Sequence, residues 1–202
     1  NLTSGNAALS DLQHAARTSI EAGDRVASVS YSGCDAASNL TTATYIKSIG
    51  GLLCWSAGND SRDLTFGNRD DDDLIVCGAT DRDDSLASFS AYGQFVDVTA
   101  PGVEVATTGD SSNDAYYYVN GTSFSCPMTA GICAMIWSVS PSLTPDQVES
   151  ILKSTVDDLG AAGVDDTFGH GRINLYEAVL NAGAAVPPTA DFVGTPTSGI
   201  EP

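Results

Sequence analysis

The chain has 202 residues, of which 42% are apolar, so it is long enough to form one domain with a sizeable hydrophobic core. Eight Lys and Arg against 26 Asp and Glu give a formal net charge of -18, which repels nucleic acids and anionic membranes. We find no apolar run of membrane-spanning length. From the charge and this absence together, we expect neither nucleic acid nor a membrane as a partner. The acidic charge either keeps the surface solvated or attracts basic substrates, and we favour the first interpretation.

Helices and strands alternate through the first hundred residues. Ser10 and Gln13 have the spacing of a capping box, which predicts a helix from Ser10 that ends at Gly23. Apolar runs predict strands over residues 26–31, 52–57, 74–79 and 95–99, and a second helix is predicted from about Asn39 to Ile49. This alternation predicts an α/β fold with a mostly parallel sheet, in which ligands bind beyond the carboxyl ends of the strands.

A serine near the middle of the second half stands at a predicted helix start. Residues 116–119 suit a strand, and a long apolar helix follows that ends near Trp137. Ser123 falls in the first turn of this helix, where free backbone N–H groups and the helix dipole favour an oxyanion. Pro127 agrees with this placement, because proline is tolerated in a first turn. On the local pattern alone, a role for Ser123 as a helix cap is favoured, because helix caps are common and nucleophiles are rare.

The C-terminal part continues with two more helices and then changes composition. Thr144 and Gln147 form a capping box around Pro145, and a last short helix is predicted from near Asn174 to Gly183. From Ala184 the sequence is rich in Pro, Thr, Ser and Gly, which indicates a boundary between a domain at 1–183 and a linker at 184–202. The linker contains Ala-Asp-Phe at 190–192, which resembles the start of a polycystic-kidney-disease-type (PKD) β-sandwich module.

The five cysteines are an odd number, so at least one is unpaired unless it pairs between molecules. Four of them lie in apolar segments and are expected to be buried thiols: Cys54, Cys77, Cys126 and Cys133. Cys34, in a predicted loop, is the candidate for a disulfide. The sequence has no Cys-x-x-Cys pair and no His/Cys cluster, so we predict no zinc site.

Residues 121–127, Gly-Thr-Ser-Phe-Ser-Cys-Pro, resemble the signature around the nucleophile of subtilisin-like serine proteases. Further motifs of that family follow the same order: Ser-Ala-Gly-Asn at 56–59, Gly-Ala-Thr-Asp at 78–81, Ala-Ser-Phe-Ser at 87–90, Val-Thr-Ala-Pro-Gly at 98–102 and Gly-His-Gly-Arg-Ile-Asn at 169–174. The resemblance covers about residues 8–182 and implies the family's three-layer α/β fold.

The resemblance implies a serine endopeptidase that acts through an acyl-enzyme. Ser123 would be the nucleophile, and its backbone N–H would form the oxyanion hole together with the side-chain amide of Asn59. Locally, Asn59 would also suit a turn. The residues implied to line the cleft for a polypeptide substrate are Ser30, Tyr31, Ser32, Gly33, Ser56, Ala57, Gly58 and Thr122.

The general base and its orienting carboxylate are not found in this sequence. In the family they come from an Asp-(Thr/Ser)-Gly motif and a His-Gly-Thr-His motif, and neither occurs among the 202 residues. We assign no catalytic role to His14 or His170. We therefore expect a C-terminal segment of a secreted protease that lacks the N-terminal strands of the sheet, has the missing N-terminal half as its partner, and is inactive alone. Any signal or pro-segment would lie outside these residues.

Other interpretations stay open at this point. A non-catalytic pseudoprotease would bind peptides in the same cleft. A lipase or esterase is disfavoured, because Ser125 replaces the second glycine of the nucleophile elbow. No cofactor is required, but the acidic runs at 70–73 and 81–84 could supply oxygen ligands for a structural calcium ion, or could simply form solvated loops.

Overall fold

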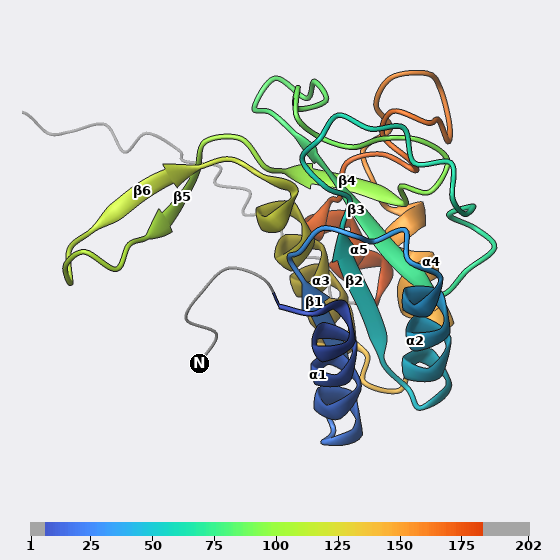
Figure 1. Ribbon diagram of the computed structural model, residues 1–202. Helices are drawn as coiled ribbons and strands as arrows, with labels where there is room; N and C mark the ends of the chain where they lie inside the picture. Colours follow the sequence, from blue (N-terminus) through green and yellow to red (C-terminus); the bar gives the residue numbers. More distant parts are fainter. Residues whose placement is uncertain (1–6, 184–202) are drawn as a thin grey trace, which may run out of the picture.

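A four-stranded parallel sheet forms the centre of the computed structural model, which describes residues 7–183 (Figure 1). The strands lie side by side in chain order: β1 (Val26–Val29), β2 (Leu52–Ser56), β3 (Leu74–Thr80) and β4 (Val98–Pro101). The registers pair Val26 with Leu52, Leu53 with Leu74, and Cys77 with Val98. The predicted parallel sheet is therefore confirmed.

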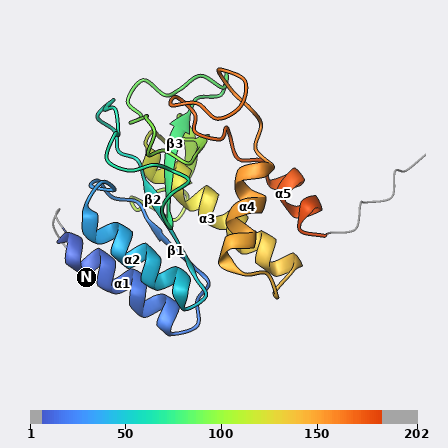
Figure 2. The same cartoon turned by 90° about the vertical axis from the view of Figure 1, so that its right-hand side faces the viewer.

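Helices cover both faces of this sheet (Figures 1 and 2). On one face lie α1 (Leu9–Glu21) and α2 (Ala37–Ser48). On the other lie α3 (Thr122–Val139), α4 (Pro145–Ser154) and α5 (Leu175–Asn181). This confirms the predicted α/β fold with three layers.

The sequence of β2 explains why both faces must be covered. Leu53 and Trp55 point into the core beneath α1 and α2, whereas Leu52 and Cys54 point into the core beneath α3. All four side chains are fully buried. A strand that is apolar on both faces is stable only between two layers of helix, so the central strands fix the sandwich.

The start of β4 differs from its prediction, because a side chain takes part in the ladder. The predicted strand covered residues 95–99, but regular pairing starts at Val98. One residue earlier, Asp97 Oδ2 accepts from the N–H of Val76 at 2.7 Å, and its Oδ1 lies 2.7 Å from Lys153 Nζ. Burial raises the pKa of Asp97, and the Lys153 ammonium opposes that shift and favours the ionised carboxylate.

Two helix starts test the capping predictions in opposite ways. The capping box at Ser10 is wrong: α1 begins two residues earlier than that box requires, with Ala8 as a cap that makes no side-chain hydrogen bond. The early start lets both Leu9 and Leu12 pack against the core. The capping box of α4 is confirmed by reciprocal hydrogen bonds between Thr144 and Gln147.

All five cysteines are free, buried thiols. The expected disulfide at Cys34 is wrong, because the loop that carries it turns inward under the end of β2. There the Cys34 thiol donates to the carbonyl of Ala57 at 3.4 Å, and burial raises its pKa to about 12.

An antiparallel hairpin projects from the body (Figure 1). Its second strand, β6 (Tyr116–Val119), was predicted, whereas β5 (Val105–Thr108) was not. β5 has only four residues, and among residues 7–183 it pairs only with β6. Because so short a segment carries little apolar pattern, the sequence alone did not predict this strand.

The core helix α3 is long and apolar enough to cross a membrane, so the interpretation that the sequence has no such run was wrong. Half of this helix is buried, however, and it packs on all four strands of the sheet. That environment is typical of the core helix of a globular domain. The predicted linker at 184–202 lies outside the described residues.

The Asp97–Lys153 pair gives a first prediction. Lys153→Met should lower the free energy of unfolding by about 3 to 5 kcal/mol, because it leaves the buried Asp97 carboxylate without its cation. Urea denaturation measures the change. The double variant Lys153→Met/Asp97→Asn should recover part of the loss, and a double variant whose loss equals the sum of the single losses would contradict the pairing.

Candidate active site

Ser123 is the second residue of α3 and lies half-buried at the carboxyl edge of the sheet. The turn before it is held to the end of β4, because the N–H of Gly121 donates to the carbonyl of Gly102 at 2.8 Å. One residue beyond Phe124, the buried hydroxyl of Ser125 donates to the carbonyl of Ala100 at 3.0 Å. The helix start is therefore fixed to the sheet on both sides of Ser123.

The side-chain amide of Asn59 is oriented by Thr122. Asn59 Oδ1 accepts from the backbone N–H of Thr122 at 2.9 Å and from its hydroxyl at 2.8 Å. The same hydroxyl accepts from the N–H of Gly58 at 3.2 Å. Because a backbone N–H can only donate, the oxygen of the amide must face Thr122 and its NH₂ group must face away.

Two N–H donors converge beside Gly121. The point that a Cβ atom on Gly121 would occupy lies 3.3 Å from Asn59 Nδ2 and 3.7 Å from the backbone nitrogen of Ser123. Gly121 has a φ of 153°, which disfavours any side chain there. The absence of a Cβ thus leaves a small space with an amide N–H on each side.

The loop after β1 joins the same region. The hydroxyl of Ser30 donates to the carbonyl of Ser123 at 2.7 Å. The carbonyl of Tyr31 accepts from Trp55 Nε1 at 2.7 Å and from the hydroxyl of Ser56 at 2.9 Å. The predicted cleft segments at 30–33 and 56–58 are therefore adjacent and bonded to each other.

The remaining predicted cleft residues take different positions. Ser32 is exposed, whereas Ala57 is buried. Gly33 is held by α2, because the buried Asn39 side chain donates to its carbonyl at 2.8 Å. Thr122 is only 1% exposed, and its N–H and hydroxyl both donate to Asn59, so its contact with substrate stays a prediction.

Sequence reasoning missed two supporting residues, Asn39 and Ser125. The sequence identified Asn39 only as the approximate start of a predicted helix, and Ser125 only as a departure from the elbow motif. A polar residue at the predicted helix start after a glycine-containing loop was the available signal for Asn39.

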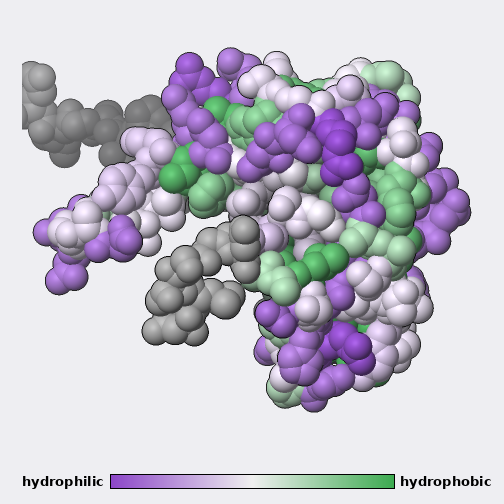
Figure 3. Space-filling model, viewed as in Figure 1, coloured by the Kyte–Doolittle hydropathy of each residue, from purple (hydrophilic) through white to green (hydrophobic). Residues whose placement is uncertain are grey.

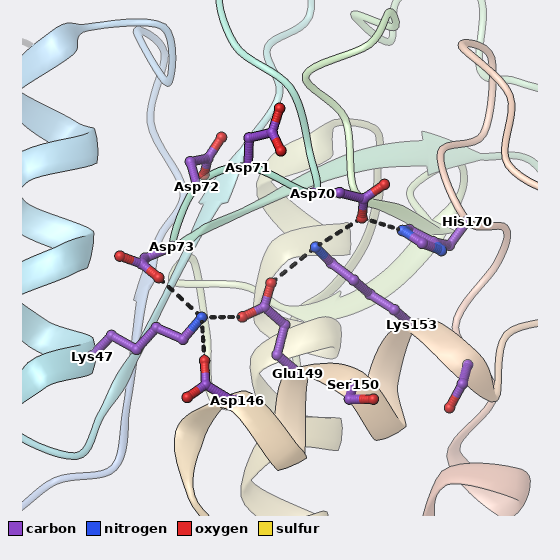
Figure 4. A pocket seen from close by; sticks show the side chains of 11 residues that line it. Lys47, Asp70, Asp71, Asp72, Asp73, Asp146, Glu149, Ser150, Lys153 and His170 are labelled. Carbon is purple, nitrogen blue, oxygen red and sulfur yellow. Dashed lines mark hydrogen bonds and ion pairs between the residues drawn. The ribbon is translucent and has the colours of Figure 1, made fainter.

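Neither histidine of the chain lies at this site. His14 is exposed on α1. His170 Nε2 lies 2.9 Å from Asp70 Oδ1, at a pocket of about 550 Å³ formed by α2, α4 and the loop at 70–73 (Figure 4). Across residues 7–183, the hydroxyl of Ser123 has no hydrogen-bond partner.

The acidic runs do not fit a calcium ion. Asp70 and Asp73 are paired with Lys153, Lys47 and His170 (Figure 4). In the second run, Asp81 caps a turn by accepting from two backbone N–H groups, and Asp84 pairs with Arg172. Within the described residues no three acidic, histidine or cysteine side chains are grouped as metal ligands. A structural calcium ion stays a prediction.

A serine at a helix start, two N–H donors beside it, and a parallel sheet between helices are typical of α/β serine hydrolases that form acyl-enzymes. The sequence profile of the Subtilase family matches residues 2–171. The chain therefore belongs to the subtilase family of serine peptidases.

Individual relatives agree with this assignment. The chain is 33% identical over 177 residues to a thermophilic serine proteinase of Bacillus sp. (strain AK1). This alignment covers 87% of this chain and 42% of that protein. It is 38% identical over 104 residues to subtilisin BL of Lederbergia lenta, which covers 52% of this chain and 37% of that protein. The chain thus spans less than half the length of these two relatives.

Solved structures show the same fold. A protease from Pseudoalteromonas arctica superimposes with a TM-score of 0.68 at 30% identity, covering 78% of this chain and 51% of that one. The prenylagaramide maturation protease superimposes with a TM-score of 0.72 at 21% identity, covering 89% of this chain and 70% of that one.

Replacing each of two glycines near Ser123 by alanine should change the free energy of unfolding in opposite directions. Gly121→Ala should lower the free energy of unfolding by about 1 to 2 kcal/mol, because alanine is strained at this backbone conformation. Gly131→Ala, inside α3, is the matched control: its new Cβ meets nothing within 4 Å, so it should stabilise the chain by about 0.5 to 1 kcal/mol. Urea denaturation compares the two, and equal effects would contradict the geometry described at Gly121.

Proposed function

We propose that the protein is a serine endopeptidase in which Ser123 attacks the peptide carbonyl and forms an acyl-enzyme. The observation that carries the proposal is the convergence of Asn59 Nδ2 and the Ser123 backbone nitrogen on the space beside Gly121. These two donors would stabilise the negative charge that develops on the carbonyl oxygen. Thr122 supports the proposal, because it holds the Asn59 amide with its NH₂ group toward that space.

The chemistry runs in two steps. In the first, the Ser123 hydroxyl loses its proton to a general base as its oxygen bonds to the carbonyl carbon. The C–N bond then breaks, and the amine leaves with that proton. In the second, a water molecule attacks the ester carbonyl and releases the acid, which restores the serine. The chain's own residues provide the nucleophile and the oxyanion donors for both steps.

The substrate would be a polypeptide in extended conformation. The adjacent backbone segments at 30–33 and 56–58 flank Ser123, and extended peptides bind such segments through main-chain hydrogen bonds. The bond from Ser30 to the carbonyl of Ser123 keeps one of these segments in place relative to the nucleophile.

The base and its orienting carboxylate would come from a further polypeptide segment of the same protein. In the described residues β1 pairs with β2 alone, so one edge of the sheet is open. A pocket of about 360 Å³ lies between α1 and β1 beside that edge. Met128 and Met135 are 37% and 44% exposed on α3. These open apolar surfaces support the docking of additional strands.

We further propose that the protein is secreted, because it is a subtilase with an acidic composition.

Active-site labelling tests the nucleophile. The complete protein should react with a fluorophosphonate probe at Ser123, and Ser123→Ala should abolish the labelling. Mass spectrometry of the labelled peptide identifies the residue. The isolated 202-residue chain should not react, because it has no base to take the serine proton.

Labelling of the isolated chain would contradict the proposed need for an additional segment. If the complete protein also fails to react but still binds peptides, the non-catalytic pseudoprotease is the better description.

Substitution of Asn59 tests the oxyanion hole. In the complete enzyme, Asn59→Ala should lower kcat by about 10² to 10³ with little change in KM, because the lost bond forms only with the transition state. Thr122→Val should have a smaller effect of the same kind, since the backbone N–H of Thr122 still holds the Asn59 amide. Steady-state kinetics on a chromogenic peptide measures both, and an unchanged kcat for Asn59→Ala would exclude Asn59 from the oxyanion hole.

A further inference from the structure

One face of the β5–β6 hairpin carries two exposed aromatic rings. Tyr116 and Tyr118 lie on the same face of β6, because side chains alternate along a strand, and they are 73% and 79% exposed. Their cross-strand partners are Thr108 and Ala106, which are small and also exposed. The hairpin that carries these two rings projects from the body of the molecule (Figures 1 and 3).

The opposite face of the hairpin is built differently. The ring of Tyr117 lies over Gly109, and its hydroxyl is 2.6 Å from the hydroxyl of Ser111. Tyr117 is only 45% exposed. The hairpin thus uses one tyrosine to hold its own loop and leaves the other two without contacts of this kind.

The charge around these rings has a single sign. Residues 103–120 contain three acidic residues, Glu104, Asp110 and Asp114, and no Lys, Arg or His. All three are exposed. Tyrosine faces attract ammonium and guanidinium groups, and nearby carboxylates strengthen that attraction. The chemistry of the hairpin therefore suits a basic ligand.

The hairpin also lies within reach of the nucleophile. Tyr118 precedes Ser123 by five residues, so their Cα atoms are at most about 18 Å apart. An extended substrate advances by about 3.4 Å per residue, so a substrate residue about five positions from the scissile bond can meet Tyr118. Tyr116 and Tyr118 are two residues apart, which matches the spacing of alternate side chains in an extended peptide.

We propose that the exposed face of the β5–β6 hairpin binds a basic, extended segment of the polypeptide substrate outside the catalytic cleft. The rings of Tyr116 and Tyr118 contact alternate Lys or Arg side chains, and Asp110 and Asp114 supply the complementary charge. The identity of this ligand as substrate rests on the proposed endopeptidase function. The binding itself does not depend on catalysis.

Binding to a defined peptide tests the hairpin. The probe is a fluorescein-labelled peptide of alternating Lys and Thr, and fluorescence anisotropy measures its Kd for the complete protein carrying Ser123→Ala, which prevents cleavage. Tyr116→Ser/Tyr118→Ser should weaken binding about tenfold. Tyr116→Phe/Tyr118→Phe keeps both rings and should bind nearly as the parent does. A peptide with Glu in place of Lys should not bind.

The controls separate the hairpin from the general acidity of the protein. Both tyrosine variants keep the net charge, so attraction to the whole surface is unaffected. Tyr176→Ser removes a ring that is 58% exposed on α5 and should leave Kd unchanged. Should the double serine variant not fold, Asp110→Asn/Asp114→Asn is the second test and should weaken binding of the Lys peptide alone.

Three outcomes would overturn the proposal: equal affinity for the double serine variant, an equal loss in Tyr176→Ser, or a concentration-dependent dimer that the double serine variant abolishes, since the occupant would then be a second copy. Tyrosine-dependent binding in a protein that fails fluorophosphonate labelling would support the hairpin and overturn the endopeptidase function instead.

Discussion

The burial of β2 and β3 on both faces is the constraint on which the rest of the structure depends. Every residue of these two strands is buried, so neither face of either strand can be exposed to solvent. Helices must therefore cover both sides, and the polar groups of the chain are displaced to the ends of the strands. The loops that follow β1 and β2, together with the start of α3, meet at the carboxyl edge as a direct result. The position of the candidate site follows from the packing of the core.

Short side chains and backbone groups hold that site together. Thr122, Ser30 and Ser56 each connect two segments through one hydroxyl, and each bond joins parts of the chain that are far apart in sequence. Short side chains lose little rotamer freedom on folding, so such contacts fix geometry at small entropic cost. By contrast, the long side chains of Lys47 and Lys153 form the ion pairs that connect α2, α4 and the sheet. The chain thus separates the residues that position Ser123 from the residues that hold the layers together.

Much of the fold could be predicted from the sequence, because its signals are local. Alternating apolar runs identified the parallel strands, and the reciprocal pattern at Thr144 and Gln147 identified the start of α4. The predictions that failed concern features that depend on contacts between distant parts of the chain. The ladder before β4 is completed by the Asp97 carboxylate, Cys34 is buried by a loop that turns inward, and β5 is defined only by its partner β6. For the candidate site, the motif gave the identities of Ser123 and Asn59, but only the fold reveals that Thr122 turns the amide and that Gly121 leaves the space between the two donors.

The five free thiols have a consequence for how the protein matures. Every cysteine is enclosed in the core and none is paired, so the fold of residues 7–183 contains no covalent cross-link. Its folding therefore needs no oxidant and no disulfide isomerase, and the same structure can form in a reducing cytoplasm or outside a cell.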